Sequence, residues 1–286
     1  MPPATLATVL VAAVAHAAWN LASTAKRGDT VLFVAVYTAG STVLCLPLAV
    51  LAATTGSQPV TWPLLGAAAV SAALHLAYSL TLQAGYDRAD LGVVYPVARG
   101  TGPLLTTVLA VAALGERPTR LAVVGALGIL AGIAVVTGNP LRRTGADPVP
   151  GLAWGAATGT TIAAYTLWDA YTVTALGLAP VSYYAGTLLL QTVALTPGVI
   201  RRRRALPHTL RVDRAPVAAV AVLSPLAYVL VLTAMQTSPV ALVAPLRESS
   251  IVIGALVAWL LTRDGGLVRR LVGAAVVLAG IVAISA

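Results

Sequence analysis

The stretch LGVVYPVARGTGPLLTTVLAVAAL, residues 91–114, contains one arginine, Arg99, in a run that carries no other charge. The run has about the 20 apolar residues that a helix needs to cross a bilayer. An arginine at the centre of a lipid-facing helix costs about 2.5–3.5 kcal/mol on insertion scales, so Arg99 should face a partner or a wet cavity. A structural ion pair and a substrate-binding site both fit this position.

The second half of the chain repeats the first. Arg99 corresponds to Arg247 at a fixed spacing, and residues 124–133 correspond in the same way to residues 272–281. We therefore expect one five-helix unit in residues 1–143 and a second copy in residues 144–286. Nearly the same spacing relates His16, Trp19, Asn20, Pro47 and Tyr78 to Tyr165, Trp168, Asp169, Pro197 and Tyr228.

The composition is that of an integral membrane protein. Of the 286 residues, 58% are hydrophobic and only 9% are charged, whereas a soluble domain carries about a quarter of its residues as charges. The net charge of +9 comes from arginines placed between apolar runs. No basic segment is interleaved with aromatic residues on a soluble face, so nucleic-acid binding is not expected. The expected surroundings are membrane lipid.

Apolar runs long enough to form helices predict an all-α membrane fold of about ten transmembrane helices, five in each copy. A chain that crosses the membrane five times begins its second copy from the opposite side, so the two repeats should be inverted. Inverted repeats are typical of transporters that bind substrate between the halves. The expected runs are 5–24, 30–53, 62–84, 91–114, 121–138, 151–172, 181–200, 215–235, 240–261 and 267–285.

Loop charges predict the orientation, because arginine and lysine are enriched in cytoplasmic loops. One side of the predicted bundle receives nearly all of them, including the Arg201–Arg204 run, whereas the other side receives only Arg117 and Arg120. We expect the Arg201–Arg204 loop to be cytoplasmic, both termini to be outside, and the protein to lie in the plasma (inner) membrane.

Glycines at small-xxx-small spacing, such as Gly151, Gly155 and Gly159, let two helix backbones approach closely in lipid. They favour packing within the bundle, and the alternative is a homodimer formed through such a face.

The predicted fourth and ninth helices carry the embedded charges. Tyr95 lies one turn from Arg99, and Arg247 is followed directly by Glu248. Adjacent residues point in different directions on a helix, so Arg247 and Glu248 are not expected to pair with each other. The ion pair that we expect is Arg99 with Glu248, across the pseudo-twofold axis. Glu248 is also the candidate to bind a coupling proton if it is unpaired.

The first predicted helix places His16, Trp19 and Asn20 on one face, because they are spaced i, i+3 and i+4. Such a polar face should turn inward rather than toward lipid. Trp168 is a further candidate, and both tryptophans have the alternative role of interfacial anchors. Asp169 is expected near the water boundary.

Further candidates to contact substrate are Tyr78 and Tyr228, which the repeat places symmetrically, and His75. Each of these side chains could equally make a hydrogen bond between helices. No metal site or cofactor is expected, because His16, His75 and His208 are widely spaced and no phosphate-binding loop is present.

As a set, the motifs HAAWN (16–20), VYPVARG (94–100), LGERPTR (114–120), APLRESSIVI (244–253) and the duplicated segments 124–133 and 272–281 resemble the EamA-type permeases of the drug/metabolite transporter superfamily. The resemblance implies ten helices as two inverted repeats around a central cavity, and secondary transport of small metabolites. One departure is Asp264, which stands in a TRDG segment where the first copy has GER.

The expected function is secondary transport, without ATP, of a small polar or amphiphilic metabolite. The embedded charges of Arg99, Arg247, Glu248 and Asp169 nearly cancel, which suits a zwitterion such as an amino acid, or an anion if the carboxylates lie outside the cavity. Arginine forks match carboxylate and phosphonate groups, so the substrate should carry one of them. A proton or another ion is a possible coupling partner. The alternative is an intramembrane enzyme acting on lipid or isoprenoid phosphates, with His16 or His75 as the base.

Overall fold

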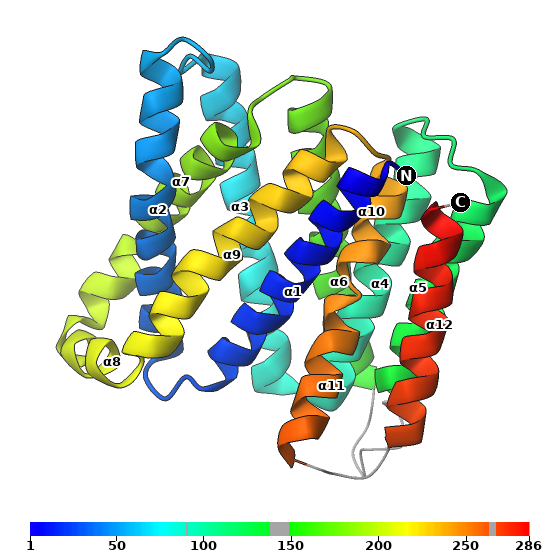
Figure 1. Cartoon of the computed structure of the whole chain (residues 1–286). Coiled ribbons are helices and arrows are strands. Elements are labelled where there is room, and N and C mark those ends of the chain that lie inside the picture. Colours follow the sequence, from blue (N-terminus) through cyan, green and yellow to red (C-terminus); the bar gives the residue numbers. More distant parts are fainter. Residues whose placement is uncertain (90, 138–148, 263–266, 286) are drawn as a thin grey trace.

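The computed structural model describes residues 1–89, 91–137, 149–262 and 267–285, and this part of the chain is helical throughout, without strands (Figure 1). The bounds follow the predicted apolar runs within a few residues, with two short additions, η2 and α8, and with the run 240–261 divided into two helices. The elements are α1 (Pro3–Thr24), α2 (Thr30–Thr54), α3 (Trp62–Arg88), α4 (Leu91–Ala113), α5 (Arg120–Thr137), α6 (Val149–Thr174), α7 (Pro180–Arg201), η2 (Arg203–Ala205), α8 (Leu206–Val212), α9 (Arg214–Met235), α10 (Val240–Arg247), α11 (Ser250–Thr262) and α12 (Leu267–Ser285).

Local sequence explains where several helices begin and end. The Asp29 side chain accepts a hydrogen bond from the backbone N–H of Leu32 at 3.0 Å and so caps α2. Pro180 occupies the first turn of α7, where its missing N–H costs nothing. Gly177 follows α6 with a φ of 64°, a left-handed conformation that glycine adopts without strain.

The two halves meet in an inverted arrangement, which the contacts between α5 and α12 establish. A Cβ atom on Gly125 would lie 2.6 Å from the carbonyl oxygen of Gly280, and one on Gly132 would lie 2.7 Å from that of Gly273. Gly125 and Gly132 correspond to Gly273 and Gly280 in the repeat. The two helices therefore run antiparallel with their backbones in contact, and they are exchanged by the pseudo-twofold axis.

A second pair of equivalent helices crosses at the other side of the molecule. The hydroxyl groups of Thr42 on α2 and Thr192 on α7, which are equivalent positions, are 2.9 Å apart. Figure 1 shows α2 and α7 on one side of the bundle and α5 and α12 on the other. The pseudo-twofold axis therefore runs across the bundle from the contact between α2 and α7 to the contact between α5 and α12, as expected for inverted repeats.

The predicted ninth helix is broken into α10 and α11 at Glu248 and Ser249. Glu248 has a ψ of −6°, which ends the regular helix, and α11 starts at Ser250. In this respect the expectation of one continuous helix over residues 240–261 is wrong. Such breaks occur at membrane depth where the backbone lies inside protein, and here residues 240–250 are all buried.

Both termini lie at one end of the bundle (Figure 1), where the Met1 amino group is 3.5 Å from the carbonyl oxygen of Ile284. At the arginine-rich end, the buried Asp213 carboxylate accepts hydrogen bonds from the backbone N–H groups of Arg27 (2.7 Å) and Gly28 (2.9 Å). Each end of the bundle thus joins elements from both halves.

The outward faces of the helices are apolar, as a lipid-facing surface requires: α2, for example, exposes Val43, Leu48 and Leu51. Within the described residues, length and composition alone qualify five helices as membrane spans, namely α1, α2, α3, α9 and α12. The chain is therefore a multi-pass membrane protein. The number of ten crossings stays a prediction.

Candidate functional site

The two repeated arginines converge on one carboxylate at the pseudo-twofold axis. Arg99 Nη1 lies 3.4 Å from Glu248 Oε2, while Arg247 donates to Glu248 Oε1 from Nε (3.1 Å) and Nη2 (2.9 Å). Glu248 is fully buried, and the two arginines are 6% and 3% exposed. The predicted pair of Arg99 with Glu248 is present in the structure.

The expectation that Arg247 and Glu248 would not pair is wrong, and the break of the helix explains why. Neighbouring side chains diverge by about 100° along a regular helix. At the break the backbone N–H groups of Glu248 and Ser249 bond to the carbonyl oxygens three residues back, and the long side chains of Arg247 and Glu248 meet there. The resulting two-point contact makes Arg247 the more firmly held of the two arginines.

Tyr95 completes the surroundings of Arg99. The guanidinium carbon of Arg99 lies 5.3 Å from the centre of the Tyr95 ring, a cation–π distance. Tyr95 therefore supports Arg99 from its own helix, α4, but is not among the residues that line the cavity described next.

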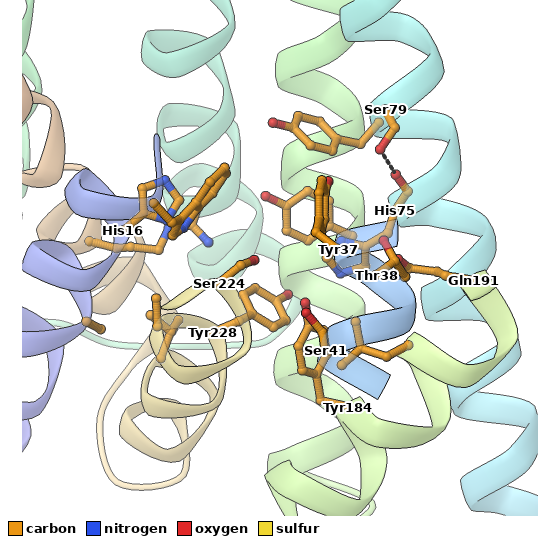
Figure 2. Close-up of a pocket in the computed structure, with 18 of the residues that line it drawn as sticks. His16, Tyr37, Thr38, Ser41, His75, Ser79, Tyr184, Gln191, Ser224 and Tyr228 are labelled. Carbon is orange, nitrogen blue, oxygen red and sulfur yellow. Dashed lines mark hydrogen bonds between the residues drawn. The ribbon is translucent and has the colours of Figure 1, made fainter. Parts of the chain in front are cut away.

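A cavity of about 110 Å³ lies between the two halves, with side chains from α1, α2, α3, α4, α6, α7, α9 and α10 around it (Figure 2). This volume holds several water-sized molecules. Both arginines reach its wall, whereas Glu248 lies behind them. The predicted residues that line it are His16, Trp19, His75, Tyr78, Arg99, Tyr228 and Arg247.

His16 presents an unpaired polar atom within the protein. Its Nε2 atom is buried and has no hydrogen-bond partner in the described part of the chain. Its ring packs edge-on against Trp19, with centroids 4.9 Å apart. His16 of α1 lies across the cavity from Tyr184 and Gln191 of α7 (Figure 2), and Trp19 of the same helix also lines the cavity.

Two other predicted residues make contacts away from the cavity. The Asn20 side chain donates a hydrogen bond to the carbonyl oxygen of His16, one turn back on its own helix, at 2.8 Å. Trp168 donates from Nε1 to the carbonyl oxygen of Ala67 on α3 at 3.0 Å. Trp168 thus joins α6 to α3, and its part in substrate binding stays a prediction, as it does for the whole predicted set.

The expectation that Asp169 lies near the water boundary is wrong. Asp169 is fully buried, and it accepts hydrogen bonds at both oxygens. Oδ1 accepts from Ser71 (2.7 Å) and from the Tyr183 hydroxyl (2.6 Å). Oδ2 lies 3.0 Å from His75 Nε2 and also accepts from the Tyr228 hydroxyl.

Aromatic rings form the cavity wall beside Asp169. His75 stacks on Tyr165 with ring centroids 4.2 Å apart, and Tyr184 packs against Tyr228 at 4.8 Å. Tyr78, the repeat partner of Tyr228, contacts Tyr165 edge-on at 5.6 Å. The cavity therefore joins a cationic wall at the arginines to an aromatic wall anchored on a buried carboxylate.

Several lining residues were not predicted. Tyr37 and Ser41 come from the apolar run of α2, where no pattern sets them apart. Tyr165 occupies the position equivalent to His16, so the repeat could have indicated it.

Glycines 151, 155 and 159 pack α6 against α4, since Cβ atoms there would meet Val93, Val97 and Thr101 at 2.6–2.8 Å. This confirms their expected role within the bundle.

Comparison with solved structures agrees with the fold. A chain described as "Crystal structure of protein" has a TM-score of 0.76 and 17% sequence identity, covering 99% of this chain and 96% of that one. At this identity the likeness concerns the fold alone. No curated protein matches the chain.

Two inverted helical repeats around a polar cavity are an arrangement common among secondary transporters. The model of the EamA-like transporter family matches residues 4–138 and again residues 149–286, so the chain belongs to the EamA-like transporter family. It is a membrane transporter of the drug/metabolite transporter type, which is consistent with the expectation that it is not an enzyme. The predicted boundary between residues 143 and 144 lies between the matches and outside the described residues.

Proposed function

We propose that this protein is a secondary transporter of small metabolites that bear a carboxylate or phosphonate group, and that Arg99 and Arg247 bind this group in the central cavity. The observation that carries the proposal is the sharing of one buried carboxylate by two guanidinium groups that both reach the cavity wall. Glu248 neutralises one positive charge and leaves the other for an anion.

The arginines also have N–H groups available for an anion. A guanidinium carries five N–H donors. Among the described residues, Arg99 makes one hydrogen bond, to Glu248, and Arg247 makes two to the same carboxylate. Planar forks of this kind match the two oxygens of a carboxylate or phosphonate. The unpaired Nε2 of His16 adds a further polar atom nearby.

The aromatic wall supports an amphiphilic substrate. Tyr78, Tyr165, Tyr184 and Tyr228 offer ring surface on the side of the cavity that also carries Asp169. Asp169 is not a site for a substrate ammonium group, because four donors already occupy its two oxygens and it is fully buried. The site therefore favours anions over zwitterions.

Transport follows from the inversion of the two halves, since each half can rock against the other and open the cavity to either side in turn. We place the protein in the inner membrane with the arginine-rich end, Arg201–Arg204, in the cytoplasm, following the distribution of loop charges.

The test is uptake into proteoliposomes of three labelled anions, L-glutamate, benzoate and phenylphosphonate, with choline as a cation and protein-free liposomes as controls. We expect saturable uptake of at least one anion and none of choline. A thermal-shift measurement with the same compounds adds an independent readout, because a ligand that binds the folded state stabilises it. Absence of uptake of all three anions, with or without uptake of choline, would contradict the proposal.

A further inference from the structure

The carboxylate of Asp169 differs in its surroundings from the carboxylate of Glu248. Glu248 is held by two permanently charged guanidinium groups. Asp169 is held by three hydroxyl groups and by His75, whose ring is the one partner that changes charge near neutral pH. A proton can therefore bind at the Asp169–His75 pair without the separation of an arginine from a carboxylate.

The His75 ring connects this buried carboxylate to the cavity. Asp169 itself is fully buried, whereas the His75 side chain is 14% exposed and lines the cavity together with Tyr228. Both of these residues contact Asp169 Oδ2. Water in the cavity can thus exchange a proton with His75 while Asp169 remains shielded.

The network is present in only one of the two equivalent places. At the spacing that relates Tyr78 to Tyr228, His75 corresponds to Pro225 and Ser71 corresponds to Ala221. Asp169 and Tyr183 correspond in turn to Asn20 and Phe33. The duplication therefore does not impose this network on both places, and only one place carries the buried carboxylate beside a histidine.

We infer that the Asp169–His75 pair is a proton-binding site that couples proton movement to anion transport. A proton from cavity water binds His75 Nδ1 while Nε2 keeps its hydrogen bond to the Asp169 carboxylate. The product is an imidazolium–carboxylate pair, and release of the same proton on the other side of the membrane restores the neutral ring. The coupling to anion movement rests on the proposed function, whereas proton binding itself does not.

Charge balance in the cavity gives the direction of the coupling. With His75 neutral, the charges of Arg99, Arg247, Glu248 and Asp169 cancel. Protonation of His75 adds one positive charge, so an anion binds more tightly to the protonated protein. Because coupling between two sites is reciprocal, the anion also favours proton binding. One proton and one anion are therefore carried in the same direction.

The other charged and titratable groups that face the Asp169–His75 pair do not take its place as the proton-binding site. Arg99 of α4 and Arg247 of α10 stay charged throughout, and His16 of α1 interacts electrostatically with both arginines. The remaining neighbours are phenols, which stay neutral at physiological pH. They are Tyr37 of α2, Tyr78 of α3, Tyr165 of α6, Tyr183 and Tyr184 of α7, and Tyr228 of α9.

The coupling is tested with the anion of the three-compound panel that is taken up fastest. The readout is the ratio of initial uptake rates with and without a pH gradient that is acidic outside. The wild-type ratio should be at least about fivefold, the lower end of usual coupling factors. Asp169→Asn and His75→Gln should each bring the ratio to one, and His208→Gln, a change on the exposed α8, should leave it unchanged.

A second measurement follows the proton without any substrate. The protein has three histidines, so ¹⁵N-histidine NMR of purified wild type resolves them, with His16→Gln and His208→Gln to assign the signals. The His75 signal should respond to a change of pH, and Asp169→Asn should alter that response.

The two measurements separate the possible failures. A His75 signal that stays constant with pH overturns the proton site, whatever the transport result. Anion uptake that is indifferent to the pH gradient, in a wild type whose His75 titrates, overturns the coupling. Absence of any anion uptake overturns the proposed function, and the His75 titration then decides the proton site alone.

Discussion

The two repeats carry equivalent arginines near the cavity, but they differ at the position of the buried aspartate. Arg99 and Arg247 occupy equivalent positions and reach the same cavity, and Tyr78 and Tyr228 are likewise equivalent. In contrast, Asp169 lies in a network of four hydrogen bonds, while its counterpart Asn20 donates to the backbone of its own helix.

This difference distinguishes features that both copies supply alike from features that have no counterpart in the repeat. The cationic centre lies on the pseudo-twofold axis, where equivalent positions of the two copies meet, and each copy supplies one arginine to it. The acidic network joins Asp169 of the second copy to Ser71 and His75 of the first, and among the described residues the equivalent place around Asn20 has no such network. Four predictions examine how closely the halves correspond, beginning with the largest effect.

The first prediction concerns the difference between the contacts that Arg247 and Arg99 make with Glu248. Arg247→Ala removes both of the short contacts and leaves only the 3.4 Å contact with Arg99, so the buried carboxylate loses most of its compensation. We expect a loss of about 3–5 kcal/mol in stability. Arg99→Ala should cost less, about 1.5 kcal/mol, since Arg247 still holds Glu248. Thermal unfolding in detergent compares the two variants.

Equal losses of stability for the two arginine variants would contradict the prediction that Arg247 holds Glu248 more firmly than Arg99 does. The double replacement of Arg247 and Glu248 by Ala and Gln provides the control, because removal of the buried charge together with its partner should recover part of the stability.

The second prediction concerns the contact between α5 and α12. Gly132→Ala places a methyl group 2.7 Å from the carbonyl oxygen of Gly273, so the two backbones must separate. We expect a loss of about 1–3 kcal/mol, the usual cost of overpacking. Gly128→Ala is the matched control on the same helix, because its nearest neighbour is at an ordinary 3.6 Å. An unchanged unfolding midpoint for Gly132→Ala would show that the halves do not meet through this pair.

The third prediction concerns a contact between the halves at the end that carries the termini. The Glu116 carboxylate accepts hydrogen bonds from the backbone N–H groups of Val240 (2.7 Å) and Ala241 (2.9 Å), and thereby caps α10. Glu116→Ala should cost about 1 kcal/mol, as other capping changes do. The exposed neighbour Arg117 supplies the control variant, Arg117→Ala, which should have no effect on thermal unfolding.

The fourth and smallest effect is expected at the threonine pair on the axis. Thr42→Val and Thr192→Val each remove the hydrogen bond between α2 and α7, and hydrogen bonds of this kind between membrane helices are worth about 0.6 kcal/mol on average. In a double-mutant cycle the two changes should be less than additive. Full additivity would mean that the hydroxyl groups do not interact.

Much of the fold could be predicted from sequence because repetition carries geometric information. The correspondence of Arg99 with Arg247 indicated two copies, and an odd number of helices per copy indicated inversion. The pair of Arg99 with Glu248 followed, since an embedded arginine needs a partner and the axis brings these two together.

The remaining features depend on where a helix stops and on what a distant helix supplies. The pairing of Arg247 with Glu248 required knowledge that α10 ends between them, and neither Pro245, which precedes Arg247, nor Gly254, which lies seven residues after it, marks that position. The burial of Asp169 depends on donors from α3, α7 and α9, which the position of Asp169 near the end of its own helix does not reveal.

The most direct test of the central claim, that the repeated arginines meet at a substrate site, is anion uptake by Arg99→Ala in proteoliposomes, with thermal unfolding measured on the same preparation. We predict that uptake is lost while the protein remains folded and extractable, and that the exposed Arg204→Ala variant transports as wild type does. Wild-type rates of anion uptake by a folded Arg99→Ala protein would contradict the account.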